Sequence, residues 1–555
     1  MKKLQAFRAG YLGQTGELLW IFLGAGAVLL LIAAANVANL LLVRAHGRNK
    51  EIVLRRALGA GGGRIARQLL TESATLAAFG GIVGLGIAAA ALSVLAPLIP
   101  NGVLPGYVEP RISAAAYLFS LVVLGAVGLG IGLVPAAVSA RVDIASRLRE
   151  GSKAAAGGGL SRIRPQHLFV IAQVSLALAL MVGAGLLTRS FQAQLGVDTG
   201  SEHIGVAAMS LQLPRARYDT NEAIQAFDRE LERRLSAIPG VGAVSLSTDL
   251  PFRNGSSGAY IFREGDGPDD RIRFHWHAVS PGFFSTIGVD VLRGRAIDDT
   301  DVEDSTPVIV ITETMERRIY GEESALGKTM HLRPDGSMPL EVVGIIEDVR
   351  FRDVTTSLLA DANSPDGFFA LRQRPSRRLE AAVRTSSDVA TVMPILRSTV
   401  RELDPNLPVS QLAPLVDAWR SQTAMPRFAA FLMTVFSMLA AVVACVGIYG
   451  ILAFTVGQRA REIAIRRAIG ATGVSVARSV LGDGVKLALA GMTVGAAVAM
   501  FGSSVLEAFL FQVERSDPTT FISVGLGMVG FALVAAIVPA LRAMKRHPAE
   551  ALKAE

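Results

Sequence analysis

Charged residues are scarce in this chain, and cysteine is almost absent. Aspartate, glutamate, lysine and arginine make up 18% of the 555 residues, whereas soluble proteins carry about 25%. The single cysteine, Cys445, excludes an intrachain disulfide. The net charge of +8 is compatible with a nucleic-acid-binding protein, but basic cytoplasmic loops give a membrane protein the same sign. The distribution of apolar residues therefore decides between these classes.

Seven long runs contain no Asp, Glu, Lys or Arg. About 20 apolar residues cross the core of a bilayer, so each run predicts a transmembrane helix. A buried helix of a soluble protein can imitate one such run, but not seven. We therefore expect a polytopic α-helical protein with about seven spans in a phospholipid membrane, and no nucleic-acid partner. The runs are Leu18–Val43, Ala74–Leu98, Ala114–Val138, Leu168–Leu187, Phe428–Val456, Leu487–Val505 and Phe521–Leu541.

The loops between these runs differ in charge, which predicts the orientation of the chain. Loops 44–67, 139–167 and 457–486 are rich in Lys and Arg and are therefore expected in the cytoplasm. The large segment 191–425 then lies outside, together with the N-terminus. The basic residues Lys2 and Lys3 fit this orientation poorly.

A ten-residue segment occurs twice. Glu51–Ala60 (EIVLRRALGA) and Glu462–Ala471 (EIAIRRAIGA) are identical at seven of ten positions, and both follow a predicted span. Paired arginines at a fixed distance from a glutamate favour a docking element for a cytoplasmic partner, although a basic loop that only sets topology has similar charge. The closing glycine of each copy suits the end of a helix. The docking hypothesis covers Glu51, Arg55, Arg56, Gly59, Glu462, Arg466, Arg467 and Gly470.

Each copy also contains a pair of glycines spaced four residues apart, Gly80/Gly84 and Gly491/Gly495. Small residues at this spacing let two helix backbones approach closely in lipid. Glycine is common in these runs, but matching positions in both copies favour a helix contact. Asn36 and Asn39 lie one turn apart in the first run, where an interhelical hydrogen bond is a simpler role than a polar path.

Segment 191–425 predicts an α+β domain. Glu222–Ile238 and Asp388–Leu403 have apolar residues at helical spacing, and Val308–Ile311 and Leu340–Val349 resemble buried strands. Such alternation suggests a sheet with helices packed on one face. His275 and His277 share one face of a predicted strand, but a zinc site needs more ligands. Two histidines at the surface of the sheet are the simpler interpretation.

The stretch Gly321–Thr329 ends in Gly-Lys-Thr, like a phosphate-binding loop. Five residues separate its two glycines, where that motif requires four, and no long helix is predicted after it. We therefore expect an ordinary loop. Neither catalytic residues nor cofactor or metal sites are predicted, and the Asn254 tripeptide is a common chance match to a glycosylation sequon.

Several of these segments together resemble a known family. The repeated regions around AANVANLLLVRA, EIVLRRALGA and EIAIRRAIGA are similar to the membrane modules of MacB/FtsX-type ABC transporter permeases. VSPGFFSTIGVDVLRGR and the stretch from PVIVITE to VVGIIEDVRF are similar to a MacB-type periplasmic core domain. The resemblance extends over nearly the whole chain.

The resemblance implies a permease subunit without an ATPase of its own. A separate cytoplasmic ATPase would drive motions of a periplasmic domain, for export or extraction of a peptide, lipoprotein, lipid or drug across the bacterial inner membrane. A periplasmic or outer-membrane partner is also implied. The segments that contain Glu51/Arg55/Arg56 and Glu462/Arg466/Arg467 match those that dock on the ATPase in this family.

The resemblance further implies a duplicated permease that has lost its first span and first outer domain. Residues 1–17 are then a remnant of an outer segment. The other expected parts are a three-helix module (18–150), a linker with one span (151–190), the periplasmic core domain (191–425) and a second module (426–555). Two alternatives stay open. One is a membrane-anchored regulator of periplasmic partners without transport. The other is a secondary transporter, which the absence of charged residues from the spans disfavours.

Overall fold

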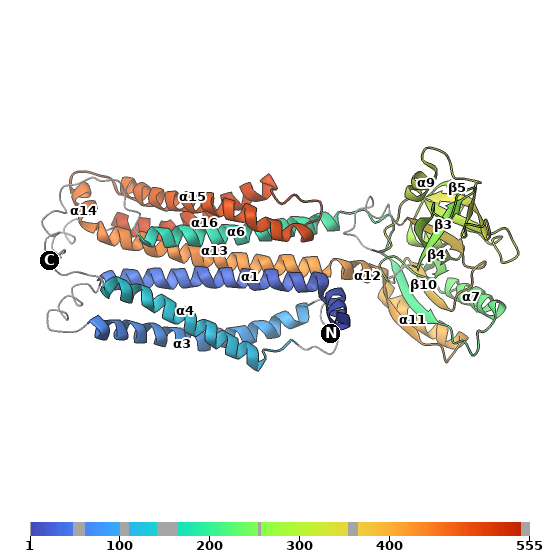
Figure 1. Ribbon diagram of the computed structural model, residues 1–555, viewed down its shortest axis with the longest axis horizontal. Helices are drawn as coiled ribbons and strands as arrows, with labels where there is room; N and C mark the ends of the chain where they lie inside the picture. The colour runs from blue at the N-terminus through green and yellow to red at the C-terminus, as the bar shows by residue number, and fades with distance from the viewer. Residues whose placement is uncertain are drawn as a thin grey trace. The chain divides into compact units, whose positions relative to one another are not determined.

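The protein is described by a computed structural model that covers residues 2–47, 62–99, 110–140, 165–253, 257–352 and 365–545. The chain divides into two compact units. Residues 1–193 and 425–555 form the helical unit, and residues 194–424 form the sheet unit. Figure 1 shows long helices in the first unit and a mixed structure of strands and short helices in the second.

The helical unit contains the predicted spans. Six of its helices are long and apolar enough to cross a membrane, and a seventh, α4, is apolar over Ala114–Gly128 and continues to Ala140. The expectation of a polytopic membrane protein is therefore confirmed. The helices are α1 (Lys2–Gly47), α3 (Gly62–Leu95), α4 (Ala114–Ala140), α6 (Pro165–Leu195), α13 (Ala424–Gln458), α14 (Ala460–Ala468), α15 (Gly473–Leu506) and α16 (Pro518–Lys545). Two short 3₁₀ helices, η1 (Ala96–Leu98) and η2 (Glu507–Phe509), follow α3 and α15.

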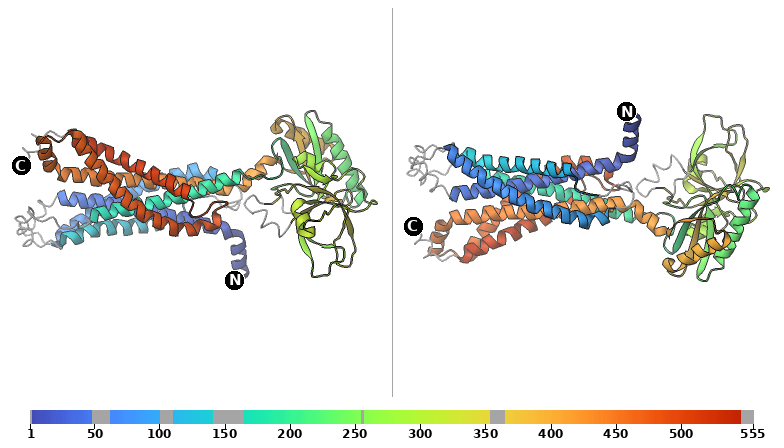
Figure 2. Two further views of the ribbon diagram at one scale, coloured as in Figure 1. Left: turned by 90° about the horizontal axis from the view of Figure 1, so that it is seen from above. Right: turned by 90° about the horizontal axis from the view of Figure 1, so that it is seen from below.

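Helix α6 lies at the centre of one group of spans. In the apolar part of its span, 67% of the residues are buried. The corresponding share is 17% for the span of α1 and zero for the span of α3. One apolar cluster joins residues of α1, α6, α13, α15 and α16. Figure 1 labels these helices, and the views of Figure 2 show the same long helices side by side. The single span between the two sequence repeats is therefore the packing partner of the second repeat. The other helices leave most of their apolar side chains uncovered, as lipid-facing helices do.

The first and the last strands of the sheet unit belong to two βαβ segments. The strands and helices of these two segments are β1 (Val206–Gln212), α7 (Asn221–Ser236) and β2 (Val241–Ser247), then β10 (Arg378–Thr385), α11 (Val389–Leu403) and β11 (Val409–Pro414). They form an antiparallel sheet in the order β11-β1-β10-β2. This arrangement is a ferredoxin-like split βαβ sheet.

Between β2 and β10 the chain forms a closed ring of strands. Strand β9 pairs with both β4 and β6, so the order β4-β3-β7-β8-β6-β9 returns to β4. Strand β5 joins the ring on β8, and the ring meets the first sheet where Ser247 of β2 pairs with Val279 of β4. The elements are β3 (Ser257–Arg263), β4 (Ile272–Val279), α8 (Phe283–Ile287), β5 (Val291–Gly294), β6 (Val308–Thr312), α9 (Glu313–Tyr320), β7 (Thr329–His331), β8 (Pro339–Ile346) and β9 (Asp366–Ala370).

Local sequence explains the two long helices of this unit. Thr220 accepts a hydrogen bond from the backbone N–H of Ala223 and caps α7, and Asp388 caps α11 in the same way. The apolar face of α7 (Ile224, Phe227, Leu231 and Leu235) is buried in the main core of the sheet unit. The predicted helices and the buried strands β6 and β8 are thus confirmed.

The sheet of the βαβ segments is covered on both faces, whereas helices on one face were expected. Alternate residues of β1 point to opposite sides. Ala207 and Met209 enter the core under α7 and α11, whereas Val206 and Ala208 enter a second core. Helix α8 and the last helix of the unit, α12 (Leu415–Gln422), close this second core. The expectation was wrong because both helices are too short to give a clear periodic signal.

Candidate functional site

The second copy of the repeated segment forms the short helix α14, between α13 and α15. Glu462 lies in its first turn, and Arg466 and Arg467 lie in its last turn. These charges match the polarity of the helix dipole. Gly470 has a φ of 105° and donates its N–H to the carbonyl of Arg467, while Ala471 donates to the carbonyl of Arg466. The glycine therefore ends the helix in a backbone conformation that other residues avoid.

Helix α14 is fixed to its neighbours by apolar and polar contacts. Ile463 and Ala464 are buried, and Ile463 packs in a cluster with residues of α15 and α16. Arg467 donates from Nη1 to the backbone carbonyl of Met544 at 2.8 Å, near the end of α16. Arg459, just before the helix, forms an ion pair with Asp483 of α15 at 3.3 Å. Any displacement of α14 must therefore move α15 and α16 as well.

The outer surface of α14 carries an ion pair that water can reach. Arg466 Nη2 lies 2.6 Å from Glu462 Oε1, and the two side chains are 61% and 49% exposed. Arg459, Glu462, Arg466, Ser475 and Asp483 help to line a shallow depression of about 80 Å³. Such an exposed pair contributes little to stability, so its charges are available to a partner. The first copy, with Glu51, Arg55, Arg56 and Gly59, lies outside the described residues.

The two predicted glycine pairs have different surroundings. A Cβ added at Gly491 would lie 2.6 Å from the Val174 side chain of α6, and one at Gly495 would lie 2.9 Å from the backbone of Ser175. Ser175 also donates from its hydroxyl to the carbonyl of Gly491 at 2.8 Å. In contrast, a Cβ at Gly80 or Gly84 meets no described atom within 4 Å. In the first repeat, the close approach of α3 to α4 occurs instead at Gly81, one residue further along.

A group of buried amides lies between α1, α6 and α13. Asn36 donates from Nδ2 to the carbonyl of Val443 at 3.1 Å, which joins α1 to α13. A Cβ at Gly447 would lie 2.1 Å from Gln173 Oε1 and 3.6 Å from Asn36 Oδ1. Gly447 therefore makes room for two amide side chains at the centre of the spans. Asn39 is also buried.

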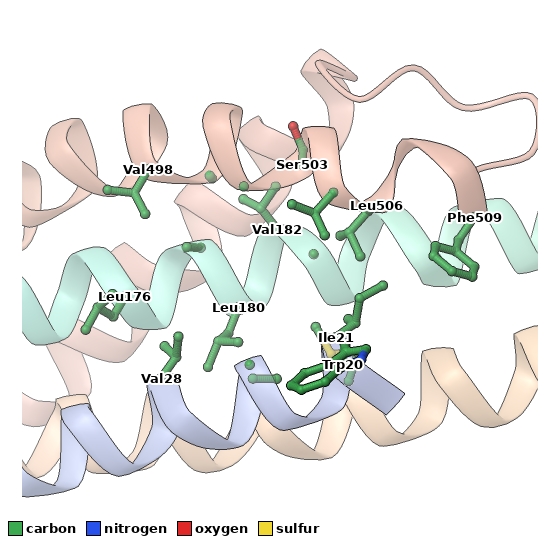
Figure 3. Close-up of a pocket in the computed structure, with 18 residues that line it drawn as sticks. Trp20, Ile21, Val28, Leu176, Leu180, Val182, Val498, Ser503, Leu506 and Phe509 are labelled. Atoms are coloured by element: carbon green, nitrogen blue, oxygen red, sulfur yellow. The ribbon is translucent and has the colours of Figure 1, made fainter. Parts of the chain in front are cut away.

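An apolar cavity of about 550 Å³ lies between α1, α6, α13 and α15. Figure 3 shows Trp20 and Val28 of α1, Leu180 and Val182 of α6, and Val498 and Leu506 of α15 around it. Ser503 has the only labelled side chain with an oxygen atom, and this hydroxyl donates to Met500 within its own helix. The cavity therefore offers apolar contacts and almost no polar ones.

In the sheet unit, His277 was expected at the surface of the sheet, but it is buried. Its side chain is fully buried, with Nδ1 2.5 Å from Asp249 Oδ1 and Nε2 2.9 Å from Asp366 Oδ1. Arg352 forms an ion pair with Asp366 at 2.6 Å. Burial alone lowers the pKa of His277, but the two carboxylates outweigh it and raise this pKa to about 9. The surface interpretation failed because both sides of β4 are covered.

The His277 cluster joins the two parts of the sheet unit. Asp249 follows β2 of the first sheet, while His277 and Asp366 belong to β4 and β9 of the ring. Phe351 and Phe368 lie against the imidazole, with ring centroids 4.0 and 5.0 Å away. Among the described residues, no group of three or more His, Cys, Asp or Glu has the arrangement of a metal site. The cluster is therefore a buried ionic contact between the two parts.

The loop that resembles a phosphate-binding motif follows α9 and leads into β7. Lys328 Nζ lies 2.6 Å from Glu323 Oε2 and 4.5 Å from the centroid of the Tyr320 ring. Helix α9 precedes the loop and has only eight residues. The lysine is therefore held by its own loop, as expected for an ordinary turn.

Sequence reasoning did not find a second buried ion pair, between Arg253 and Glu380. Arg253 Nε lies 3.1 Å from Glu380 Oε2, and the two side chains are 5% and 1% exposed. The hydroxyl of Ser210 donates to Glu380 at 2.6 Å. Glu380 lies within the apolar strand β10, and a glutamate in such a strand indicates a buried partner. No residue near Glu380 in the chain indicates which cation pairs with it.

Comparison with known proteins identifies both kinds of unit. The FtsX-like permease C-terminal family matches residues 23–144 and 434–548, and the MacB-like periplasmic core domain family matches residues 168–405. The uncharacterized ABC transporter permease YknZ of Bacillus subtilis is 32% identical over 145 residues, which are 25% of this chain and 34% of that protein. The macrolide export ATP-binding/permease protein MacB of Neisseria gonorrhoeae is 21% identical over 282 residues, which are 50% of this chain and 43% of that protein.

The chain spans less than half of the length of these curated relatives. Among solved structures, the periplasmic region of MacB from Actinobacillus actinomycetemcomitans has 15% identity and a TM-score of 0.28, covering 41% of this chain and 97% of that one. The extracellular domain of YknZ from Gram-positive bacteria has 17% identity and a TM-score of 0.26, covering 37% and 100%. From the two family matches and the apolar helices, the chain is a multi-pass membrane protein with regions similar to the FtsX-like permease C-terminal family on either side of a region similar to the MacB-like periplasmic core domain.

Proposed function

We propose that this chain is the permease subunit of an ABC transporter of the inner membrane. A separate cytoplasmic ATPase drives it, and the resulting motion reaches the sheet unit, which lies in the periplasm. The transported or extracted substrate is a peptide, lipoprotein, lipid or drug. The relatives named as ATP-binding/permease and export proteins support this function.

The observation that carries the proposal is the attachment of α14. This helix exposes the Glu462–Arg466 pair and is fixed to α15 and α16 through Ile463 and Arg467. A partner that pulls on α14 therefore pulls on the second membrane module as a whole. Arg466 can form charge-assisted hydrogen bonds with acidic groups of the ATPase, each of which contributes about 1.5–3 kcal/mol.

Helix α13 gives a direct route from this docking element to the sheet unit. It runs without interruption over 35 residues from Ala424 to Gln458, a length of about 52 Å at 1.5 Å per residue. Ala424 is the last residue of the sheet unit, and Arg459 directly precedes α14. By the sequence repeat, Glu51, Arg55, Arg56 and Gly59 form an equivalent docking element. In this proposal residues 18–150 and 426–555 are the two membrane modules, and 191–425 is the periplasmic domain.

Charge reversal on α14 tests the proposal. Arg466→Glu combined with Glu462→Arg keeps the ion pair within the helix but inverts the charge that a partner meets. We expect this double variant to insert normally and to lose most of the ATPase that co-purifies from membranes. Arg478→Glu is the control, because Arg478 is an exposed arginine of α15 outside α14. Equal recovery of the ATPase with the double variant and with this control would contradict docking at α14.

A membrane-anchored regulator without transport is the second candidate function. It shares the ATPase and the periplasmic domain, so pull-down of the ATPase does not separate the two. ATPase activity of the assembled complex does. A transporter is stimulated by its substrate, whereas a regulator responds only to its periplasmic partner.

A further inference from the structure

A cleft lies on the ring of strands in the sheet unit, apart from the helices that carry the proposed function. Strands β3, β4 and β9 and the β3–β4 and β7–β8 connections contribute to its walls, and its volume is about 460 Å³. Sites for small organic ligands commonly measure about 300–1,000 Å³. We call it the Trp276 cleft, after one of the residues that line it.

Aromatic side chains form much of the Trp276 cleft. Trp276 of β4 and Phe369 of β9 lie with ring centroids 6.0 Å apart; Phe369 is buried in the main core, and the partly buried Trp276 packs against this core. Tyr260 of β3 also lines the cleft and is 46% exposed. Buried contacts hold Trp276 and Phe369 in place, so their positions are set before any ligand arrives. Flat apolar groups pack well on such faces.

Two arginines complete the cleft. The Cζ atom of Arg374 lies 4.0 Å from the centroid of Phe369, and that of Arg271 lies 5.0 Å from the centroid of Tyr260. Within the described part of the chain, neither guanidinium has a carboxylate or a hydrogen-bond acceptor of its own. Burial lowers the pKa of Arg374, and no nearby carboxylate opposes this effect. Stacking on a ring leaves the N–H groups at the guanidinium edge free to bind an anion.

Two carboxylates of the β3–β4 connection are already engaged by their own turn. Asp266 accepts a hydrogen bond from the backbone N–H of Arg263 at 2.9 Å, and Asp270 accepts one from Gly267 at 3.0 Å. Both carboxylates therefore satisfy backbone donors of their own turn. Arg293 and Arg295 of β5, by contrast, each have an acidic partner. Among the described residues Arg374 has no acidic partner, although its side chain is partly buried.

We propose that the Trp276 cleft binds a small organic anion with an aromatic body. The flat body packs against the partly buried Trp276, and the carboxylate or sulfonate group accepts hydrogen bonds from Arg374 and Arg271. An arginine fork matches the two oxygens of a carboxylate. This binding site is independent of the ATPase docking at α14.

The test uses the full chain in nanodiscs of phosphatidylcholine, with 2-naphthoate as the probe. Equilibrium dialysis measures its binding against empty nanodiscs, which correct for partition into lipid. We expect saturable binding to the wild type, and at least about tenfold weaker binding to Arg374→Gln, because a charge-assisted contact is lost. Arg271→Gln, on the rim, should also weaken binding. Arg215→Gln replaces an exposed arginine outside the cleft and should bind like the wild type.

The neutral analogue 2-naphthamide separates the anion from the aromatic body. We expect it to bind the wild type at least about tenfold more weakly than 2-naphthoate, because it lacks the charge that the arginines recognise. Equal binding of the two compounds, or equal loss of binding in Arg271→Gln and Arg215→Gln, would overturn the proposal. Absence of saturable binding to the wild type would overturn it as well.

Discussion

The contact between α6 and α15 leads to a quantitative prediction for Gly495→Ala. The new Cβ would lie 2.9 Å from both Cα and the carbonyl oxygen of Ser175. Carbon atoms in contact are normally about 3.5–4.0 Å apart, so α15 has to move away from α6 by roughly 0.6–1 Å. Because the atoms of Ser175 belong to the backbone, no side-chain rotation can relieve the clash.

Two opposing effects set the magnitude. Overpacking of this kind destabilises a core by about 1–3 kcal/mol. Alanine has a higher helix propensity than glycine, which offsets about 1 kcal/mol. The matched control is Gly80→Ala in the first repeat, where nothing described lies within 4 Å of the new Cβ and only the gain in propensity applies. We therefore expect Gly495→Ala to be less stable than Gly80→Ala by about 1–3 kcal/mol.

The single cysteine supplies the assay. Cys445 lies in α13 and is partly buried in the core shared with α6 and α15. A maleimide dye that fluoresces on reaction with thiols follows its exposure on heating, and so reports on the helical unit rather than the sheet unit. The midpoint for Gly495→Ala should lie several degrees below that for Gly80→Ala. Equal midpoints would refute the inference that this glycine is required for the approach of the two helices.

Two further predictions concern topology and pH. The topology is tested in a Cys445→Ser background, with an impermeant thiol reagent added to cells whose outer membrane is permeabilised. The reagent should label Ser398→Cys in the sheet unit and should not label Ser475→Cys next to α14. The reverse pattern would contradict the proposed orientation. The pKa of His277 is about 6.5 in the unfolded chain and is raised to about 9 in the folded state. The ionic contacts of His277 therefore stabilise the fold fully below pH 6.5, and this stabilisation is lost as the pH rises through 9. The melting temperature of the sheet unit, followed by circular dichroism, should fall over this range, and a decrease of the same size in His277→Gln would exclude His277 as its origin.

The sequence predicts those features whose signal is local. The apolar spacing and the Thr220 cap specify α7 within about twenty residues, and the absence of charge specifies each span. The repeat identifies α14, because a second copy of Glu462 and Arg466 at the same spacing is rare by chance. In each of these cases the relevant residues are neighbours in the chain.

Features that depend on distant pairing could not be predicted. Alternation along β4 correctly places His275 and His277 on one face, but whether that face is buried depends on α8, β9 and Phe351. Strand β9 follows β4 by almost ninety residues, and nothing in either segment specifies their parallel pairing. The contact of Arg467 with the backbone of Met544 had no signal at all, because any residue supplies a carbonyl.

The position of β1 in the sheet has a consequence for how the domain is made. Both neighbours of β1, which are β10 and β11, come from the last fifth of the sheet unit. During synthesis from the N-terminus, β1 emerges first and keeps two unpaired edges until more than 160 further residues have followed. Exposed strand edges pair readily with other chains, and pairing over long sequence separations is slow. In the proposed orientation this domain folds on the periplasmic side. It therefore depends most on periplasmic chaperones in the interval after β1 has emerged and before β10 arrives.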